Sequence, residues 1–571
     1  MAKFGERFLL GFTSPRSPQL ISEYIKIIRK YNLDGKNYDT DLQESFYNIL
    51  SREKVAGVET GNAKNKALAG RDKLTRMPQA LGFLITQHNK KFQITEAGAL
   101  LENKDLFSDI MLHQILKYQL PSVLHREQET NKGRFNIKPF LELIRLINKL
   151  DYLTYNELLT YGMTFTDYNE FDNVVEAILL YRQRRNVAKD NGENIREFDY
   201  VNLKTVFGKL YSDIIDSGKI KTRESKTDTI DKFVKKKLSN LSDYADSIFR
   251  VLISTELIIN SKGRSLQINP KRKIEVDYIL QNVPRTIMPL NIDRNVFDEY
   301  ISNPRIPILL NDSISNLLKS INDLGGDTRH INLDIYCLKS HLNNLREKNK
   351  KAVITAQVDE LKTRNSEVID DILSMFEQIT NKEIEPASMR PTYYEWNIWR
   401  AMTMINHGNI KGNFIVDDMG NPISTASGGQ SDIIGDYGAF KIGVEVTLST
   451  GNKQYEMESE PVGRHIGELQ KKGPAFGIFI AEKLQDSVIN YFYTTSLLNS
   501  AIYNGKVNVI PIDTQIFIDF FKKAVCKDVQ PDDLYKIHEY SLAKAKENFY
   551  NERTEKDWHG CIIQFMLDIV S

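Results

Sequence analysis

The feature that most restricts the fold of this chain is an alternating segment near its C-terminal end, residues 439–449 (AFKIGVEVTLS). Apolar residues alternate there with polar residues or glycine, which is the period of a β-strand. The preceding GDYG (435–438) has the composition of a tight turn. The pattern therefore predicts a β-hairpin that carries Glu445 and Thr447 on the face opposite the core, with Asp432 beside them on the partner strand.

This pair of acids suggests a metal site. Carboxylates on adjacent strands, here Asp432 and Glu445, are hard oxygen ligands of the kind that Mg²⁺ prefers. A metal bound there can activate water and stabilise the charge that develops on a phosphoryl group. An acid, a dozen residues and a second acid is also the spacing of PD-(D/E)XK nucleases. The spacing alone is common, and the competing interpretation is a polar hairpin face exposed to solvent.

The segments that flank the hairpin favour a nuclease core. Residues 393–405 (YYEWNIWRAMTMI) predict an apolar-faced helix that carries a third acid, Glu395. Downstream, residues 455–472 lead into a helix with His465 expected near its start. Two further apolar segments predict buried strands, residues 474–481 (PAFGIFIA) and 506–512 (KVNVIPI). The order helix, hairpin, helix, strand, helix, strand agrees with an α/β nuclease domain.

The composition narrows the class of protein. The 571 residues contain 76 Lys and Arg against 75 Asp and Glu, a net charge of +1. No apolar run approaches the ~18 residues that cross a bilayer, and no signal peptide is recognisable, so we expect a soluble cytoplasmic protein without a membrane partner. The three cysteines form no CxxC pair, which argues against a disulfide framework or a cysteine zinc site. Near-neutral charge argues weakly against a nucleic-acid partner.

The charge is, however, unevenly distributed along the chain. Residues 61–100 carry seven basic and two acidic residues, and residues 201–280 carry sixteen against ten. Residues 151–200 carry five against ten, so an acidic stretch hides two basic ones in the total. Basic stretches are usually solvated surface, but here they coincide with a recognisable order of elements.

Each basic stretch reads as a helix followed by a strand, a polar turn and a second strand. The first covers residues 71–101, with Thr95 as the expected N-cap of a following helix. The second covers residues 232–270, after a short capped helix at 153–163. This order suggests winged-helix units, in which a helix enters the DNA major groove and the wing contacts phosphate. The alternative is a pair of structural α+β subdomains without DNA contact.

The DNA-contact candidates lie in these two stretches and ahead of the first. Arginine can bind guanine bidentately, and lysine or arginine can hold phosphate. The candidates are Arg16, Arg71, Lys73 and Arg76, with Lys262 and Arg264 at the second turn.

Between the basic stretches and the nuclease segment, residues 276–385 show apolar residues at helical spacing, which predicts a helical linker. The composition of the proline-containing EPASMRP (385–391) predicts that the linker ends there. We therefore expect a multi-domain α+β and α/β protein. Its expected parts are winged-helix subdomains at 1–150 and 151–275, a helical linker at 276–385 and a PD-(D/E)XK nuclease domain at 386–571.

Several motifs together resemble the AlwI-type family of type IIS restriction endonucleases, which includes strand-specific nicking enzymes. In the first half the similar stretches are TSPRSP (13–18), RDKLTRMPQALGF (71–83), ITEAGALL (94–101) and INP (268–270). In the second half they are Glu395-Trp396, Gln430-Ser431-Asp432, Glu445-Val446-Thr447 and MESEPVGRH (457–465). The last is far more specific than the spacing of two carboxylates.

The resemblance implies cleavage a few bases to one side of a short asymmetric DNA site. It assigns Asp432, Glu445 and Glu395 to the acidic, Mg²⁺-binding positions and His465 to the family histidine. Thr447 stands where the general nuclease signature has lysine, and AlwI-type relatives also have threonine there. Lys453 and Lys471 are alternative sources of the positive charge.

The leading hypothesis is therefore a Mg²⁺-dependent type IIS restriction or nicking endonuclease that acts on double-stranded DNA. The first alternative is a sequence-specific DNA-binding protein with an inactive nuclease fold, and the second is a scaffold without nucleic acid. One nuclease site per chain cuts one strand per encounter. A double-strand break then needs a homodimer, a small partner subunit or a second event.

Overall fold

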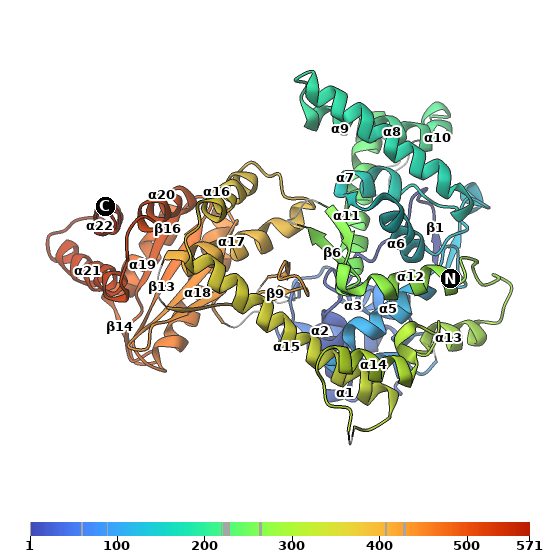
Figure 1. The fold of residues 1–571 in the computed structure, drawn as a ribbon, viewed down its shortest axis with the longest axis horizontal. Helices are drawn as coiled ribbons and strands as arrows, with labels where there is room; N and C mark the ends of the chain where they lie inside the picture. The colour runs from blue at the N-terminus through green and yellow to red at the C-terminus, as the bar shows by residue number, and fades with distance from the viewer. Residues whose placement is uncertain are drawn as a thin grey trace. The chain divides into compact units, whose positions relative to one another are not determined.

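The structure is a computed structural model of the 571-residue chain. It describes residues 2–58, 61–87, 90–218, 220, 229–261, 265–329, 331–405, 408–425 and 430–571. Contacts within the chain divide it into two compact units, Met1–Lys348 and Asn349–Ser571, called here the N-terminal and C-terminal units (Figure 1). No helix among the described residues combines the length and the apolar character that a membrane span requires.

The N-terminal unit begins with three helices and a short hairpin. In chain order the elements are α1 (Leu20–Lys30), α2 (Thr40–Arg52), α3 (Lys66–Leu74), a π-helical turn (Thr75–Gln79), β2 (Leu84–Ile85), β3 (Gln93–Ile94) and α4 (Glu96–Leu100). Between α1 and α2, Asn37 forms a single antiparallel bridge to Lys91, next to β3. Asp39, Asn65 and Thr95 cap α2, α3 and α4 by accepting a backbone N–H that the helix leaves unpaired. The Thr95 cap confirms the expectation from the sequence.

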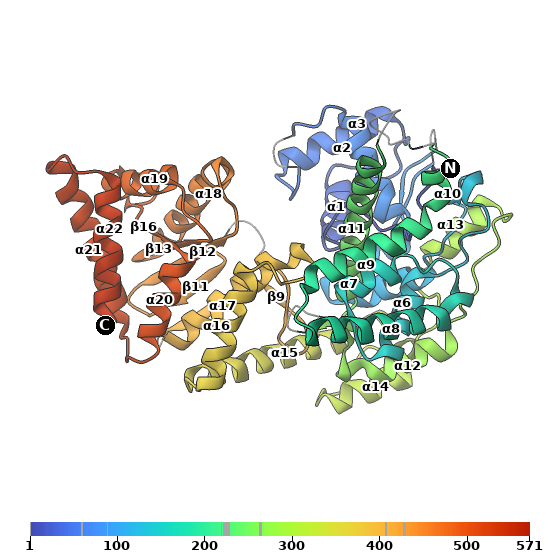
Figure 2. The same ribbon diagram turned by 90° about the horizontal axis from the view of Figure 1, so that it is seen from above.

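The same order of elements occurs a second time. It consists of α6 (Pro139–Leu150), β5 (Leu153–Thr154), α7 (Tyr155–Glu157), α11 (Ile230–Ser254), β6 (Ile258–Ser261) and β7 (Ser265–Ile268). The three strands form one sheet in the order β5-β7-β6. Thr154 caps α7 with a complete capping box, within the segment 153–163 where a short capped helix was expected. The helices α8 (Phe171–Asp190), α9 (Ile195–Leu210) and α10 (Ser212–Asp216) are inserted between α7 and α11 (Figure 2).

Helices also dominate the segment expected to be a helical linker. They are α12 (Lys273–Asn282), α13 (Arg294–Ser302), α14 (Ile314–Asp323), α15 (Ile335–Lys362) and α16 (Ser366–Thr380). The N-terminal unit also contains α5 (Phe107–Lys117) and two parallel strands, β1 (Ala2–Phe4), which precedes α1, and β4 (His125–Glu127).

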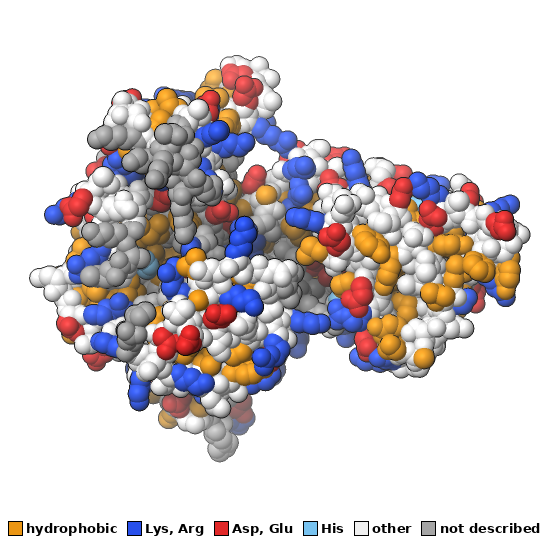
Figure 3. All heavy atoms as spheres, turned by 180° about the vertical axis from the view of Figure 1, so that it is seen from behind, with side chains coloured by type: hydrophobic (Ala, Val, Ile, Leu, Met, Phe, Trp, Pro, Cys, Tyr) orange, Lys and Arg blue, Asp and Glu red, His pale blue; other side chains and the backbone are white. Residues whose placement is uncertain are grey.

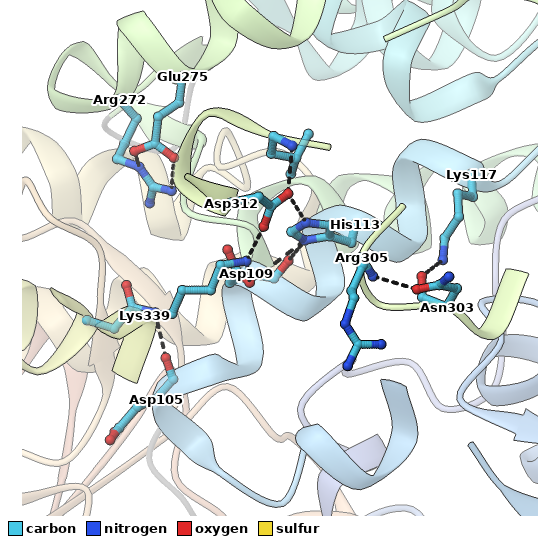
Figure 4. A network of polar contacts seen from close by, with 12 residues as sticks. Asp105, Asp109, His113, Lys117, Arg272, Glu275, Asn303, Arg305, Asp312 and Lys339 are labelled. Atoms are coloured by element: carbon cyan, nitrogen blue, oxygen red, sulfur yellow. Dashed lines mark hydrogen bonds and ion pairs between the residues drawn. The ribbon is translucent and has the colours of Figure 1, made fainter. Parts of the chain in front are cut away.

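A buried polar network joins α5 to the beginning of α15 within the N-terminal unit (Figure 4). Lys339 donates to Asp109 at 2.8 Å and to Asp312 at 2.6 Å, and its side chain is 3% exposed. Nε2 of His113 lies 3.0 Å from Asp312. Burial raises the pKa of Asp312, but the hydrogen bond and charge of His113 and those of Lys339 outweigh burial and lower this pKa to about 2.

Removing Lys339 should destabilise the N-terminal unit strongly. Lys339→Met leaves Asp109 and Asp312 without their buried cation, and breaking such a pair costs about 3–5 kcal/mol. Urea unfolding at pH 7 should show this loss in the transition of the N-terminal unit. The control is Arg329→Met, because Arg329 and its partner Asp327 are 83% and 59% exposed and exposed ion pairs contribute little to stability. Equal, small losses for both variants would contradict the expectation.

The C-terminal unit contains a five-stranded mixed sheet in the order β16-β13-β12-β11-β8. Its strands are β8 (Asn409–Gly412), β11 (Ile433–Asp436), β12 (Lys441–Thr447), β13 (Ala475–Ala481) and β16 (Val509–Asp513). The strands β8, β11 and β12 pair antiparallel, whereas β12, β13 and β16 run parallel. The predicted hairpin and both predicted buried strands are confirmed, and β8 is an addition. Two short antiparallel pairs lie outside this sheet, β9 (Ile415–Val416) with β10 (Pro422–Ser424) and β14 (Asn499–Ser500) with β15 (Gly505–Lys506).

Helices cover this sheet on both faces. They are α17 (Arg390–Ile405), α18 (Asn452–Gln470), α19 (Asp486–Leu497), α20 (Thr514–Ala524), α21 (Pro531–Tyr550) and α22 (Glu555–Ile569). Met402 of α17 and Phe517 of α20 line the same apolar interior as Phe476 and Ile478 of β13. The helix that carries Glu395, α17, is buried on all sides from Thr392 to Ile405 rather than along one apolar face, because it lies in this interior.

Candidate active site

The candidate site is built on the hairpin of β11 and β12. Asp432 comes directly before β11, and its Oδ2 accepts a hydrogen bond of 2.8 Å from the backbone N–H of Val446. This bond ties the Asp432 carboxylate to the part of β12 that carries Glu445 and Thr447. The hairpin therefore brings the two predicted acids together.

The polar face of the hairpin is closed rather than exposed to solvent. Glu445 is 7% exposed and Thr447 is 8% exposed, because α18 packs over this face of the sheet. A Cβ atom at Gly443 would lie 2.4 Å from Cδ1 of Ile466, and one at Gly477 would lie 2.7 Å from its Cγ1. The two glycines thus let α18 approach the sheet closely at Ile466, the residue after His465.

His465 contacts the acid on β12. Its Nδ1 lies 3.0 Å from Oε1 of Glu445, and the two side chains are 12% and 9% exposed. Burial raises the pKa of Glu445, while the hydrogen bond and charge of His465 oppose this rise. The expected position of His465 near the start of its helix was wrong. The helix begins at Asn452, directly after the positive-φ Gly451, and it continues through Pro461, so that His465 lies in its last third.

The site contains a further acid, Glu458, which was not predicted from the sequence. Oε1 of Glu458, on α18, accepts hydrogen bonds from Thr447 Oγ1 at 3.1 Å and from Ser449 Oγ at 3.2 Å. Glu458 precedes His465 by two helical turns, so both side chains project from the same side of the helix. That spacing, inside MESEPVGRH, was the signal that could have identified Glu458.

Repulsion among the carboxylates is the main electrostatic feature of the site. Burial raises the pKa of Asp432 well above its usual range, and the charges of Glu395 and Glu445 raise it further. Glu395 is 5% exposed on α17. The backbone N–H of Val446 opposes the shift, and Glu458 adds to it. All three predicted acids therefore belong to one electrostatic group.

The chemistry of these donors fits a hard divalent cation, because a metal ion neutralises carboxylates that otherwise repel one another. Within the described residues, no three side chains of His, Cys, Asp or Glu are grouped tightly enough to hold a metal ion. The site thus has two properties of a metal site, oxygen donors and accumulated negative charge. Its carboxylates do not, however, all point to one common position.

Neither candidate for the missing positive charge joins this group. Lys471 donates to Glu468 at 2.6 Å on the surface of α18, and Lys453 is exposed near the start of that helix. Gln430 is also exposed. The hydroxyl of Thr447 donates to Glu458 at 3.1 Å.

The predicted DNA-contact residues lie in the N-terminal unit. Arg71 and Arg76 line a cleft there, and Lys73 lies on α3, partly buried. Arg16 is 71% exposed, with Nη2 at 3.6 Å from Asp243 of α11. Lys262 and Arg264 fall outside the described residues.

Comparisons with known proteins agree with the motifs. The chain matches the AlwI restriction endonuclease family over residues 79–520. It is similar to the solved small subunit (R.BspD6I2) of the heterodimeric restriction endonuclease R.BspD6I, with 28% identity, a TM-score of 0.28 and coverage of 34% of this chain and 97% of that one. It is also similar to the BpuJ1 endonuclease binding domain, solved in complex with pyrene- and phenanthrene-modified DNA, with 12% identity, a TM-score of 0.31 and coverage of 50% and 92%. No curated protein matches the chain.

Proposed function

The chain belongs to the AlwI restriction endonuclease family, so it is a site-specific DNA endonuclease, and we propose that it is a type IIS restriction or nicking enzyme. In this proposal winged-helix subdomains, at 1–150 and 151–275, bind a short asymmetric site. A helical linker at 276–385 connects them to a PD-(D/E)XK nuclease domain at 386–571, which cuts a few bases away. Support for the winged helices comes from the repeated order of helix, bridge or strand, two helices and hairpin in the N-terminal unit.

The observation that carries the catalytic proposal is the placement of three acids together: the Asp432 carboxylate is hydrogen-bonded to the backbone of Val446, next to the buried Glu445, and the charges of Glu445 and of the buried Glu395 raise its pKa. A buried group of negative charges is costly unless a cation balances it. When bound by these three carboxylates, Mg²⁺ supplies a polarised water and stabilises charge on the phosphate.

The residues of the chain have distinct tasks in this hydrolysis. With its Nδ1–H donated to Glu445, His465 fixes that carboxylate and keeps Nε2 as an acceptor for a proton of the attacking water. As the water oxygen bonds to phosphorus, the bond to the 3′ oxygen breaks and leaves a 5′-phosphate. Glu458 holds the hydroxyls of Thr447 and Ser449 and so fixes the end of β12.

A plasmid assay tests the proposed function. Supercoiled plasmids of varied sequence, incubated with the full chain and Mg²⁺, should give nicked circles before linear DNA, because one site per chain cuts one strand per encounter. Run-off sequencing of both strands should place each cut at a constant offset from one asymmetric sequence. Absence of nicked and linear DNA over a wide range of salt and enzyme concentration would refute the proposal. If the rate at which linear DNA forms rises with the square of the enzyme concentration, a homodimer cuts both strands. If linear DNA forms only after a cell fraction is added, a small partner subunit cuts the second strand.

A further inference from the structure

The N-terminal unit contains a long cleft that is separate from the acidic group. It consists of two adjoining hollows of about 1030 Å³ and 1050 Å³. Gly5, Glu6, Arg76 and Tyr244 line both hollows, which makes them continuous. Figure 3 shows that basic and acidic side chains are intermixed over the visible face of the N-terminal unit. Surface charge on that face therefore does not identify a DNA-binding surface. The residues that line the cleft are used instead to identify the DNA contacts.

One wall of the cleft is formed by α3 and the π-helical turn after it. Arg71, Asp72, Thr75, Arg76 and Gln79 line it, at the spacing of one helical face. Asp72 accepts from Arg71 at 3.2 Å and from Arg76 at 2.8 Å, so one carboxylate orients both arginines. Arg76 also donates from Nη1 to Thr13 Oγ1 at 2.6 Å. Two of its five N–H donors are used in this way, one on each terminal nitrogen, so three remain on a guanidinium whose orientation is fixed. Arginine is the residue that most often binds guanine.

The other wall is one face of α11. Phe233, Lys236, Lys237, Asn240 and Tyr244 line it and recur every three or four residues. Lys237 donates to both carboxylate oxygens of Glu6, at 2.7 and 2.8 Å, and is 17% exposed, so it anchors the helix to the N-terminal segment. Lys236 and Asn240 also line the cleft and are partly exposed.

The two walls are equivalent elements of the repeated order described above. In each repeat the wall is the last helix before the hairpin, α3 before β2 and α11 before β6. A short N-terminal segment connects them. The backbone N–H of Phe12 donates to Ser247 of α11 at 2.7 Å, and the N–H of Met77 donates to the carbonyl of Ser14 at 3.2 Å. Together with the bond from Arg76 to Thr13, these contacts fix the spacing of the walls.

We propose that α3 and α11 are two unlike recognition helices that bind one continuous DNA site in this cleft. Arg76, oriented by Asp72 and Thr13, reads a guanine from one wall. Asn240 reads a base from the other wall, and Lys236 contacts a phosphate beside it. Arginine forks and side-chain amides are the groups that distinguish bases in the major groove, whereas a lysine ammonium adds affinity without sequence preference. Because the two faces carry different side chains, the site that they read is asymmetric. This inference rests on the proposed function.

Binding measurements with substituted duplexes test it. The full chain in EDTA is titrated with the duplex found by run-off sequencing and with each of its single-base variants. Arg76→Lys keeps the charge and loses the fork, so discrimination should fall about 10-fold or more at one base position. Asn240→Ala should cause a similar loss at a different position. Lys236→Ala should weaken binding to every duplex alike and lower the salt dependence by about one phosphate contact.

The controls are matched to these variants. Lys235→Ala removes the same charge from the neighbouring position of α11, outside the cleft lining, and Arg29→Lys changes an arginine that is paired with Glu102. Both should bind as the unchanged chain does. Arg71→Lys, at a more exposed position beside Asp72, replaces Arg76→Lys if the latter does not fold.

Two results would overturn the inference: wild-type binding by both Asn240→Ala and Lys236→Ala, or loss of discrimination at the same position by Asn240→Ala and Arg76→Lys. A chain that cuts its site while the α11 variants behave normally refutes the two-helix cleft alone. A chain that neither binds a site nor cuts DNA refutes the proposed function itself.

Discussion

Asp432→Asn should abolish DNA cleavage and leave DNA binding intact. The substitution removes a carboxylate from the proposed metal site but keeps an oxygen that can accept the N–H of Val446. Losing a group that stabilises transition-state charge costs about 100- to 1000-fold in rate, and losing a metal ligand costs at least as much. We therefore expect a loss of about 1000-fold or more in the initial rate of plasmid nicking with Mg²⁺.

The same substitution should also stabilise the C-terminal unit. A carboxylate whose pKa is raised by folding opposes the folded state once it ionises, so its destabilising effect is present at neutral pH and absent at low pH. Asp432→Asn removes that effect, and the melting temperature at pH 7 should rise.

Asp436→Asn provides the control on the same hairpin. Asp436 lies at the surface in a 3.0 Å ion pair with Lys441 and is 40% exposed, so this variant should cut at the normal rate. Normal cutting by Asp432→Asn, or equal loss in both variants, would show that the acid was assigned wrongly.

His465→Ala should reduce the cleavage rate by about 100- to 10,000-fold, which is the usual contribution of a general base. The loss should appear in the rate of a single turnover at saturating enzyme and not in the dissociation constant for DNA. His465→Gln separates proton transfer from positioning, because glutamine can still donate to Glu445 but cannot take up a proton. We expect His465→Gln to be as slow as His465→Ala.

Recovery of most of the rate in His465→Gln would show that His465 only positions Glu445. Lys471→Gln is the control, because Lys471 lies on the same helix and is bound to Glu468 at the surface. Its rate should stay normal. A loss in Lys471→Gln as large as that in His465→Ala would instead support Lys471 as the source of positive charge.

Much of the C-terminal unit could be predicted from local pattern. The alternation in residues 439–449 specified β12 and its polar face, and the apolar runs specified β13 and β16. These segments are short, and their apolar residues either alternate or form a continuous run. Both their burial and their periodicity therefore predict β-strands. The Thr95 cap was predictable for a similar reason, since it is a local hydrogen bond.

What could not be predicted depends on tertiary contacts. Pro461 normally breaks a helix, yet α18 runs through it because Val462 and Ile466 are buried against the sheet. The exposure of the hairpin face likewise depended on whether a helix would cover it. The lysine run at 235–237 resembled solvated surface, and only the fold shows that Lys236 and Lys237 line a cleft whereas Lys235 does not.

The segment that joins the two walls of the cleft has a consequence for how such enzymes diversify. Phe12 is bound to α11, while Thr13 and Ser14 are bound to the π-helical turn that follows α3. The spacing of the two walls is therefore set by the segment at residues 12–14, and not by the side chains proposed to contact bases. Altered specificity could then be selected one half-site at a time, from small libraries at Arg71 and Arg76 or at Lys236 and Asn240, without rebuilding the scaffold.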